Sequence, residues 1–473
     1  MLPKLTKITT LKENISIAIL FDNPEQLPEN LLTENEFVYL KNKLEKDNEC
    51  TVYKYPRILF FGKISEKKEN YLQAEAARVT GALLFDTLKA ENIKSVQLVN
   101  FGRNELIAYF LEGLLLSGYS FKKYKKEKNK FDLDEIFILD ETISESRFSE
   151  MSNLVQAVFY ARDLVNEPLS YLTATQLSEE ISKMGKEAGF SVEIFDKKKI
   201  ETMRMGGLLA VNKGSIDPPT FTIIEWKPAD AVNSNPVVLV GKGIVFDTGG
   251  INLKTAQKSM DDMKSDMAGG AVVAATVYVV AKNKLPIHVV GLVPATDNRP
   301  DGNAFVPGDV ITMFDGTTVE IGSTDAEGRL LLADALSFAK KYKPKLVIDI
   351  ATLTGAAEIV AGKHAIVGMG NSKENMEVLK QSGFETCERI IEVPLWDEYA
   401  EPLKSEIADL NNNGIREAQA TIAGKFLEHF TDYNWLHLDA AGVSFLFEKD
   451  KYRPEGGTGF GIRLLYNFLK KIN

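Results

Sequence analysis

Apolar residues in the first third of the chain follow two different periods. Short, nearly continuous apolar runs favour strands, and longer segments with apolar residues at helical spacing favour helices. The predicted strands cover residues 15–21, 57–61, 95–100 and 135–139. The predicted helices cover residues 69–89 and 104–116. This alternation is typical of an α/β domain, and we find no constellation of catalytic side chains in it.

Beyond residue 150 the chain becomes richer in Gly, Ala and Thr, which places a domain junction near this point. A helix over residues 150–170 ends at Asn166-Glu167-Pro168. The apolar run 236–246, interrupted by Gly241, Lys242 and Gly243, suits a central strand that is buried on both faces. Further strands are predicted at 287–294, 346–353 and 435–438, helices at 267–282 and 328–341, and a hairpin around Asp315-Gly316.

Length, composition and charge narrow the class of protein. A chain of 473 residues favours two domains, and 44% hydrophobic with 26% charged residues is a normal globular balance. The net charge of −10 disfavours a sequence-independent nucleic-acid binder. Cys50 and Cys387 are the only cysteines, so a reducing compartment fits. The apolar run 15–21 is too short for a signal peptide, and no stretch reaches the length of a membrane span. We therefore expect a soluble cytoplasmic protein.

The segment from Ser323 to Arg329 concentrates charged side chains directly before a predicted helix. Asp325 and Glu327 are two positions apart, so both carboxylates can face the same side. Arg329 adds a planar cation at a helix N-terminus, where free backbone N–H groups favour an anion. The alternative is an ordinary helix start with acidic capping residues.

A second charged cluster lies upstream and contains Lys242, Asp247, Lys254 and Asp266. A lysine in a buried strand needs either an acidic partner or a neutral amine bound to a metal. Lys254 could polarise a carbonyl or stabilise an oxyanion, or it could be a surface lysine. Asp247 and Asp266 could bind metal, or be a turn aspartate and a helix N-cap respectively.

Together the two clusters supply the groups needed to hold two divalent metals and to act on a polarised carbonyl. Met263 could line a substrate side-chain pocket or belong to the core. The four histidines lack the spacing of an H-E-x-x-H zinc motif, and the chain has no G-x-S-x-G motif. A zincin or a serine or cysteine nucleophile therefore has no support.

Four motifs carry a resemblance to the leucyl aminopeptidase family, also called cytosol aminopeptidases or M17 metallopeptidases. They lie at residues 240–254, 260–266, 323–329 and 351–355. The resemblance covers roughly residues 155–473 and extends to residues 1–150 in layout only. The chain departs from the family at Ser323, where Asn is usual, in a longer loop at 255–265, and at 414–421, which lacks the usual glycines.

The resemblance implies specific roles for the charged residues. One metal site would use Asp247, Asp325 and Glu327, and the other would use Lys242, Asp247, Asp266 and Glu327. Lys254 and Arg329 match the two catalytic positions, and Arg329 would hold a bicarbonate that acts as the proton shuttle. The candidate pocket residues are Met263, Thr352 and Gly355. The metals of the family are Zn²⁺, often exchangeable with Mn²⁺ or Mg²⁺.

We therefore expect a di-metal aminopeptidase that releases leucine-like N-terminal residues from peptides. Its fold would be α/β, with a smaller N-terminal domain at 1–150 for assembly or access and a larger catalytic domain at 151–473 around a central mixed sheet. The family implies a homohexamer. The alternatives are an added DNA-binding architectural role and a catalytically silent scaffold.

Overall fold

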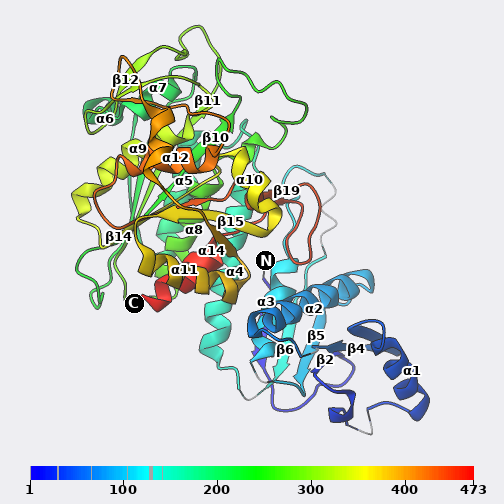
Figure 1. The fold of residues 1–473 in the computed structure, drawn as a ribbon. Coiled ribbons are helices and arrows are strands. Elements are labelled where there is room, and N and C mark those ends of the chain that lie inside the picture. Colours follow the sequence, from blue (N-terminus) through cyan, green and yellow to red (C-terminus); the bar gives the residue numbers. More distant parts are fainter. Residues whose placement is uncertain are drawn as a thin grey trace. The chain divides into compact units, whose positions relative to one another are not determined.

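The structure, a computed structural model, describes residues 2–28, 31–64, 66–103, 105–126, 131–140 and 142–472. Its backbone contacts divide the chain into two compact units (Figure 1). The first unit comprises Met1–Gln156 and Glu448–Glu455, and the second comprises Ala157–Phe447 and Gly456–Asn473. Helix α4 (Glu145–Asn166) runs through the first boundary.

The first unit is built on a six-stranded sheet with the order β1-β6-β5-β2-β4-β3. All neighbouring strands are parallel except β3 and β4. The strands are β1 (Lys4–Lys7), β2 (Ser16–Phe21), β3 (Glu49–Lys54), β4 (Arg57–Lys63), β5 (Ser95–Asn100) and β6 (Glu135–Leu139). The helices are η1 (Pro24–Gln26), α1 (Glu34–Leu44), α2 (Asn70–Ala90) and α3 (Leu106–Ser117).

The sequence pattern located the buried strands of this unit but missed three of its more exposed elements. β1, β3 and α1 escaped because at least half of their residues are exposed or half-buried, which breaks the apolar pattern. Asn104, the predicted first residue of α3, lies outside the described residues. The segment Glu448–Glu455 joins this unit through contacts with α2: Lys449 Nζ lies 2.6 Å from Asp86 Oδ1, and Tyr452 donates to Glu75 Oε2.

The second unit is built on a nine-stranded mixed sheet. Its main path is β16-β15-β18-β14-β9-β11-β8-β7, and β10 pairs with β11 beside this path. The central strands are β9 (Val237–Gly241), β10 (Gly243–Asp247), β11 (Val289–Asn298), β14 (Leu346–Ala351) and β18 (Trp435–Asp439). The outer strands are β7 (Ser191–Phe195), β8 (Thr220–Trp226), β15 (Ala365–Gly370) and β16 (Arg389–Glu392). The predicted α/β class with a central mixed sheet is confirmed.

Helices cover both faces of this sheet (Figure 1). One group packs together and contains α5 (Ala174–Ala188), α8 (Ala268–Lys282) and α14 (Ile462–Lys471); the other contains α7 (Gly206–Asn212), α9 (Gly328–Ala339) and α12 (Gln419–Glu428). The remaining helices are α6 (Lys197–Met203), η2 (Met263–Ser265), η3 (Lys340–Tyr342), α10 (Gly355–Ala361), η4 (Gly362–His364), α11 (Lys373–Thr386), η5 (Asp397–Leu403) and α13 (Ala441–Ser444). Short strands β12 (Val310–Thr312), β13 (Thr318–Glu320) and β17 (Leu410–Asn411) form a separate small sheet, and β19 (Phe445–Leu446) pairs with β20 (Gly456–Gly457). Within the described residues, no helix is both long and apolar enough to cross a membrane.

The apolar run 236–246 is two strands rather than the single one predicted. β9 lies between β14 and β11, whereas β10 pairs with the later part of β11. At the break, the Lys242 N–H donates to Ile350 O and the Lys242 carbonyl accepts from Gly270 N–H. The break therefore ties the centre of the sheet to the start of α8.

Several polar side chains end or follow the central strands. Asp247 ends β10, Asn298 ends β11, Thr352 follows β14 and Asp439 ends β18. The carboxyl ends of such strands are the usual ligand-binding edge of an open α/β sheet. The fold thus brings together side chains that are far apart in the sequence.

Candidate metal centre

Two loops carry most of the charged residues that the sequence singled out. The first leaves β10 at Asp247 and turns back through Gly249 and Gly250, whose φ values of +86° and +67° favour glycine. Asp247 Oδ1 accepts from Gly249 N–H at 2.8 Å, which stabilises the turn. The turn brings Lys254 back beside Asp247, where its ammonium lies 2.8 Å from Asp247 Oδ2.

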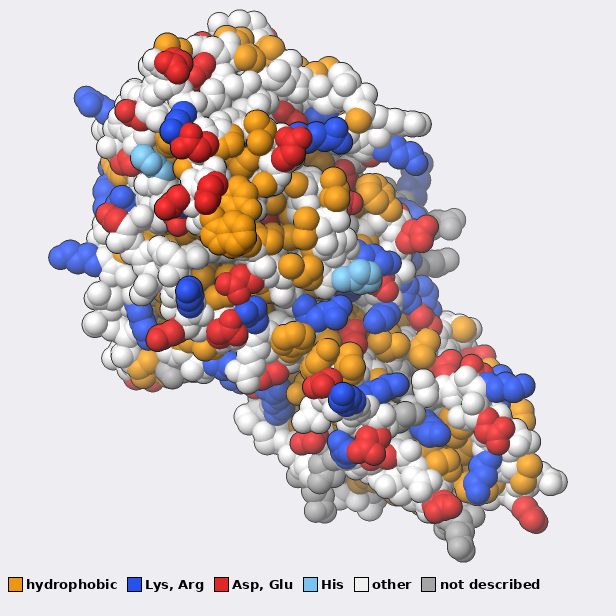
Figure 2. Space-filling model, in the orientation of Figure 1, with side chains coloured by type: hydrophobic (Ala, Val, Ile, Leu, Met, Phe, Trp, Pro, Cys, Tyr) orange, Lys and Arg blue, Asp and Glu red, His pale blue; other side chains and the backbone are white. Residues whose placement is uncertain are grey.

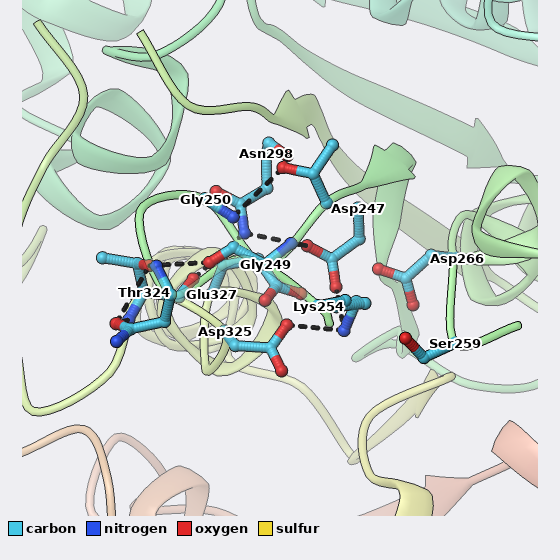
Figure 3. Close-up of polar contacts among 12 residues, drawn as sticks. Asp247, Gly249, Gly250, Lys254, Ser259, Asp266, Asn298, Thr324, Asp325 and Glu327 are labelled. Carbon is cyan, nitrogen blue, oxygen red and sulfur yellow. Dashed lines mark hydrogen bonds and ion pairs between the residues drawn. The ribbon is translucent and has the colours of Figure 1, made fainter. Parts of the chain in front are cut away.

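The second loop leads from β13 into α9 and carries Asp325 and Glu327. Lys254 Nζ bridges the two loops, because it also lies 2.5 Å from Asp325 Oδ1 (Figure 3). Glu327 stands at the N-cap position of α9, yet its side chain makes no capping hydrogen bond within the described residues. Simple helix capping therefore does not account for this glutamate.

Lys242 lies at the buried side of the same cluster. Its ammonium is 2.8 Å from Asp266 Oδ1, 3.0 Å from Glu327 Oε1 and 2.8 Å from the Thr352 carbonyl oxygen. The ion pairing that the sequence left open for this lysine is thus present, and its partners are two of the proposed metal ligands. Asp266 follows η2, and Met267 is the N-cap of α8, so Asp266 is not the N-cap of that helix.

Burial and mutual repulsion raise the pKa values of the carboxylates, whereas the neighbouring lysines lower them, so the net shifts differ in direction. Burial and the nearby Glu327 raise the pKa of Asp247 to about 6, and burial raises the pKa of Asp266 well above its ordinary value. Burial also acts to raise the pKa of Glu327, but the ammonium groups of Lys242 and Lys254 outweigh it and lower that pKa. Burial would lower the pKa of Lys242, yet the carboxylates of Asp266, Glu327 and Asp247 outweigh it and raise the pKa. The cluster therefore has an excess of buried negative charge that a bound cation would relieve.

The donor set fits divalent metal ions. One oxygen each from Asp247, Asp325 and Glu327 can be chosen so that all three lie within 4.8 Å of one another. Asp266 Oδ2 and Glu327 Oε2 are buried and have no hydrogen-bond partner in the described part of the chain. Buried carboxylate oxygens without a donor are costly unless a cation satisfies them. Oxygen-rich ligation of this kind suits Mg²⁺ and Mn²⁺ and is compatible with Zn²⁺.

Arg329 lies in the first turn of α9 and is buried, with 4% of its surface exposed. Its Nη1 donates to the Asn412 carbonyl oxygen at 2.8 Å, and Nε has no hydrogen-bond partner among the described residues. Burial lowers the pKa of this guanidinium to about 10. A buried cation with an unused donor beside a helix N-terminus fits a small anion.

The three candidate pocket residues have different surroundings. Thr352 Oγ1 donates to Asp266 Oδ1 at 2.8 Å, so this residue orients a proposed metal ligand. Met263 is half-buried in η2, and Gly355 is exposed at the start of α10. A side-chain pocket lined by these residues stays a prediction.

Several polar residues beside the cluster were missed by the sequence analysis. Asn298 donates to Asp247 Oδ1, and Thr324 connects the two loops by donating to the Gly249 carbonyl at 2.6 Å (Figure 3). Asn252 Oδ1 accepts from Thr324 N–H, and Asp439 accepts from Leu353 N–H and from Thr354 Oγ1. Of these residues, only Asp439 was anticipated, since it follows the predicted strand 435–438; Asn298 lies beyond the end of the predicted strand 287–294 and carried no signal.

Two departures from the family have visible local consequences. Ser323 Oγ accepts from Asp325 N–H at 3.2 Å, so the serine still supports the ligand loop. In the segment 414–421, Ala418 has a φ of +54°, a conformation that glycine adopts more readily. This segment therefore carries local backbone strain at Ala418.

Comparison with known proteins agrees with this arrangement. The model of the catalytic domain of the cytosol aminopeptidase family matches residues 159–466. A probable cytosol aminopeptidase of Chlorobaculum tepidum is 47% identical over 384 residues, covering 77% of this chain and 75% of the relative. Another from Geotalea uraniireducens is 39% identical over 455 residues, covering 94% of this chain and 91% of the relative.

Solved structures extend the similarity to nearly the whole chain. The bottromycin maturation enzyme BotP in complex with Mn has a TM-score of 0.86 and 27% identity, and the match covers 97% of this chain and 99% of BotP. A tomato leucine aminopeptidase mutant has a TM-score of 0.88 and 23% identity, and the match covers 99% of this chain and 96% of the tomato chain. This second match shows a similarity of fold. The matched region contains every charged residue of the cluster, and the chain belongs to the cytosol aminopeptidase family, whose members are metal-dependent peptidases.

Proposed function

We propose that this protein is a two-metal aminopeptidase that releases N-terminal residues, preferably leucine-like ones, from peptides. The observation that carries the proposal is the approach of Asp247, Asp325 and Glu327 oxygens within 4.8 Å of one another. Lys242 and Asp266 lie directly beside this group through their contacts with each other and with Glu327. The manganese named with BotP and the activity named for the tomato enzyme support the same reading.

Each side chain would have a defined task. Asp247, Asp325 and Glu327 would hold one ion, and Lys242, Asp247, Asp266 and Glu327 would hold the other. When bound, the two ions supply activation of water and polarisation of the scissile carbonyl. Asp266 would orient the free α-amine of the substrate, which is why cleavage would be confined to the N-terminal residue.

Two cationic side chains, those of Lys254 and Arg329, would each bind an anionic group during the reaction. Lys254, at the open side of the cluster, would donate to the oxyanion that forms when the carbonyl carbon is attacked. Arg329 would bind a bicarbonate through its guanidinium and the N–H groups at the start of α9. When bound, bicarbonate supplies a group that can take up and release a proton next to the reacting atoms.

Hydrolysis of leucine p-nitroanilide by the purified protein tests the proposal. We expect activity that chelation removes and that Mn²⁺ or Zn²⁺ restores, and a higher kcat/KM for the leucine substrate than for the alanine or glutamate p-nitroanilides. Glu327→Ala should abolish turnover with the fold retained, whereas Glu374→Ala, an exposed glutamate of α11, should leave it unchanged. Wild-type-like turnover of the Glu327 variant would refute the metal assignment. Inactivity with every metal would favour the silent scaffold.

Assembly and location are parts of the same proposal. We propose a homohexamer in the cytoplasm, because the family implies it and because large apolar side chains are exposed on the second unit, among them Ile359, Trp396 and Ile407. The net charge of −10 disfavours DNA binding, and acidic and basic side chains are interspersed on the face that Figure 2 shows. Light scattering measures the assembly, and a gel shift at physiological salt tests for DNA.

A further inference from the structure

Asn412 lies directly behind the loop that carries Asp325 and Glu327. It follows β17, a two-residue strand paired with β13, and none of its surface is exposed. We propose that Asn412 is a positioning residue, whose side-chain amide holds this loop in the shape that presents both carboxylates. The inference rests on the proposed function, since it assigns a role within the same metal centre.

The amide of Asn412 matches the loop at four points. Oδ1 accepts from Gly322 N–H at 2.8 Å and from Ser323 N–H at 3.2 Å. Nδ2 donates to the Ser323 carbonyl at 2.8 Å and to the Ala326 carbonyl at 3.3 Å. These contacts use both acceptor positions and both donor hydrogens of the amide. An aspartate would lack the donors, and a glutamine would be one carbon too long.

The contacts lie on both sides of Asp325. Ser323 precedes it and Ala326 follows it, so the amide spans the residue that bears the carboxylate. On the opposite side, Thr324 is held by Asn252 and by the Gly249 carbonyl. The ligand loop is thus clamped between Asn412 and the turn that follows Asp247.

The main chain of Asn412 extends the same support to Arg329. Its carbonyl oxygen accepts from Arg329 Nη1 at 2.8 Å, while its N–H donates to the Glu320 carbonyl at 3.0 Å. One residue therefore fixes both the loop with the proposed metal ligands and the guanidinium proposed to bind bicarbonate. Replacing only the side chain separates the two effects, because the carbonyl remains.

The full-length protein carrying Asn412→Ala or Asn412→Asp tests the inference. Asn413→Ala is the matched control, since Asn413 is the exposed neighbour in the same segment. Electron paramagnetic resonance of the free ion gives the Mn²⁺ affinity of each variant. Steady-state kinetics with leucine p-nitroanilide at saturating Mn²⁺ give kcat and KM, and scanning calorimetry gives the melting temperature. Residues that orient metal ligands typically change metal affinity or activity by about 10- to 100-fold.

We expect both Asn412 variants to bind Mn²⁺ about 10- to 100-fold more weakly and to lose kcat by a similar factor, with a smaller change in KM. Asn413→Ala should stay within about twofold of the wild type in all three quantities. A lower melting temperature with unchanged Mn²⁺ affinity and kcat would overturn the inference and leave Asn412 a purely structural role.

The outcome separates this inference from the function on which it rests. A wild-type protein that binds Mn²⁺ but hydrolyses none of the aminoacyl substrates contradicts the proposed activity, and the affinity measurement still decides the role of Asn412. A wild-type protein that binds no divalent ion contradicts both. An active, Mn²⁺-binding wild type, with weaker Mn²⁺ binding and lower kcat in the Asn412 variants alone, supports both the proposed function and the role of Asn412.

Discussion

The side chain of Asn298 lies 2.8 Å from Asp247 Oδ1 and donates a hydrogen bond to it. The same amide nitrogen donates to the Thr324 carbonyl at 3.0 Å. Because Gly249 N–H also bonds to Asp247 Oδ1, that oxygen has two donors and Oδ2 is turned toward Lys254. Asn298 thus sets the rotation of the Asp247 carboxylate, which would contribute to both proposed metal sites.

Replacement of Asn298 by alanine should therefore weaken the metal centre without unfolding the protein. We expect metal affinity or kcat to fall by about 10- to 100-fold, because Asp247 would lose the donor that fixes its orientation. Titration with Mn²⁺ and steady-state kinetics measure the change. The control is Asn434→Ala, which replaces an exposed asparagine that is distant from Asn298 in the sequence. Unchanged affinity and turnover would show that Gly249 N–H alone suffices.

Lys254→Ala should reduce kcat by about 10²–10³-fold if the lysine stabilises the oxyanion. The reason is its position: the ammonium contacts Asp247 and Asp325 while 16% of the side chain remains exposed, so it can reach substrate. Steady-state kinetics at saturating metal give the value. The exposed Lys258 of the same loop supplies the control variant Lys258→Ala. An unchanged rate would remove Lys254 from the mechanism.

Glu388→Ala should destabilise the second unit while leaving the turnover of folded protein intact. The buried carboxylate accepts from Gly461 N–H and Leu464 N–H at 2.9 Å each and from Arg463 Nε at 3.0 Å, so it caps the start of α14. Removing it strips a buried arginine of its carboxylate, which typically costs about 3–5 kcal/mol. Urea denaturation measures the loss. Glu385→Ala, which breaks a pair with Lys471 that is more exposed, should cost less than about 1 kcal/mol.

Ala418→Gly should stabilise the protein by about 0.5–1 kcal/mol. The residue has a φ of +54°, which costs an L-residue about 1–2 kcal/mol, and the gain is partly offset by the greater freedom of glycine in the unfolded chain. Ala420→Gly, inside α12, should act in the opposite direction by about 1 kcal/mol or more. Denaturation midpoints of the two variants decide the matter, and a destabilised Ala418→Gly protein would contradict the strain.

The buried pair of His437 and Asp349 predicts a pH dependence of stability. Their Nδ1 and Oδ1 atoms are 2.5 Å apart. Burial would lower the pKa of His437, but Asp349 outweighs it and raises the pKa above the ordinary 6.5. Because the pKa of His437 is higher in the folded than in the unfolded protein, protonation stabilises the fold. This stabilisation is fully present below pH 6.5 and is lost as the pH rises through the pKa of His437 in the folded state. The melting temperature of the wild type should therefore exceed that of His437→Asn by more at pH 6 than at pH 9. A difference that grows with pH would falsify this assignment.

The sequence predicted the central architecture because buried strands and amphipathic helices leave strong periodic signals. It failed at the run 236–246, which it predicted as a single strand. Lys242 interrupts this run, and its main chain bonds to Ile350 and Gly270 on other elements at the point where β9 ends and β10 begins. The charged cluster was assembled from motifs, whereas Asn298 and Asn412 act through contacts that join segments more than 25 residues apart. An asparagine has no periodicity that reveals such a partner. Polar positioning groups therefore required the three-dimensional structure.

The segment Glu448–Glu455 gives the first unit a second, late piece of chain. During synthesis, the residues that bind Asp86 and Glu75 leave the ribosome only after the whole stretch Ala157–Phe447 has been made. A fragment that stops at Gln156 would lack these partners, so Asp86 would lose its contact with Lys449 and, among the described residues, Glu75 would keep only its pairing within α2, with Arg78. The unit that is translated first is consequently among the last to be completed, so a stalled or truncated chain exposes an unfinished N-terminal domain.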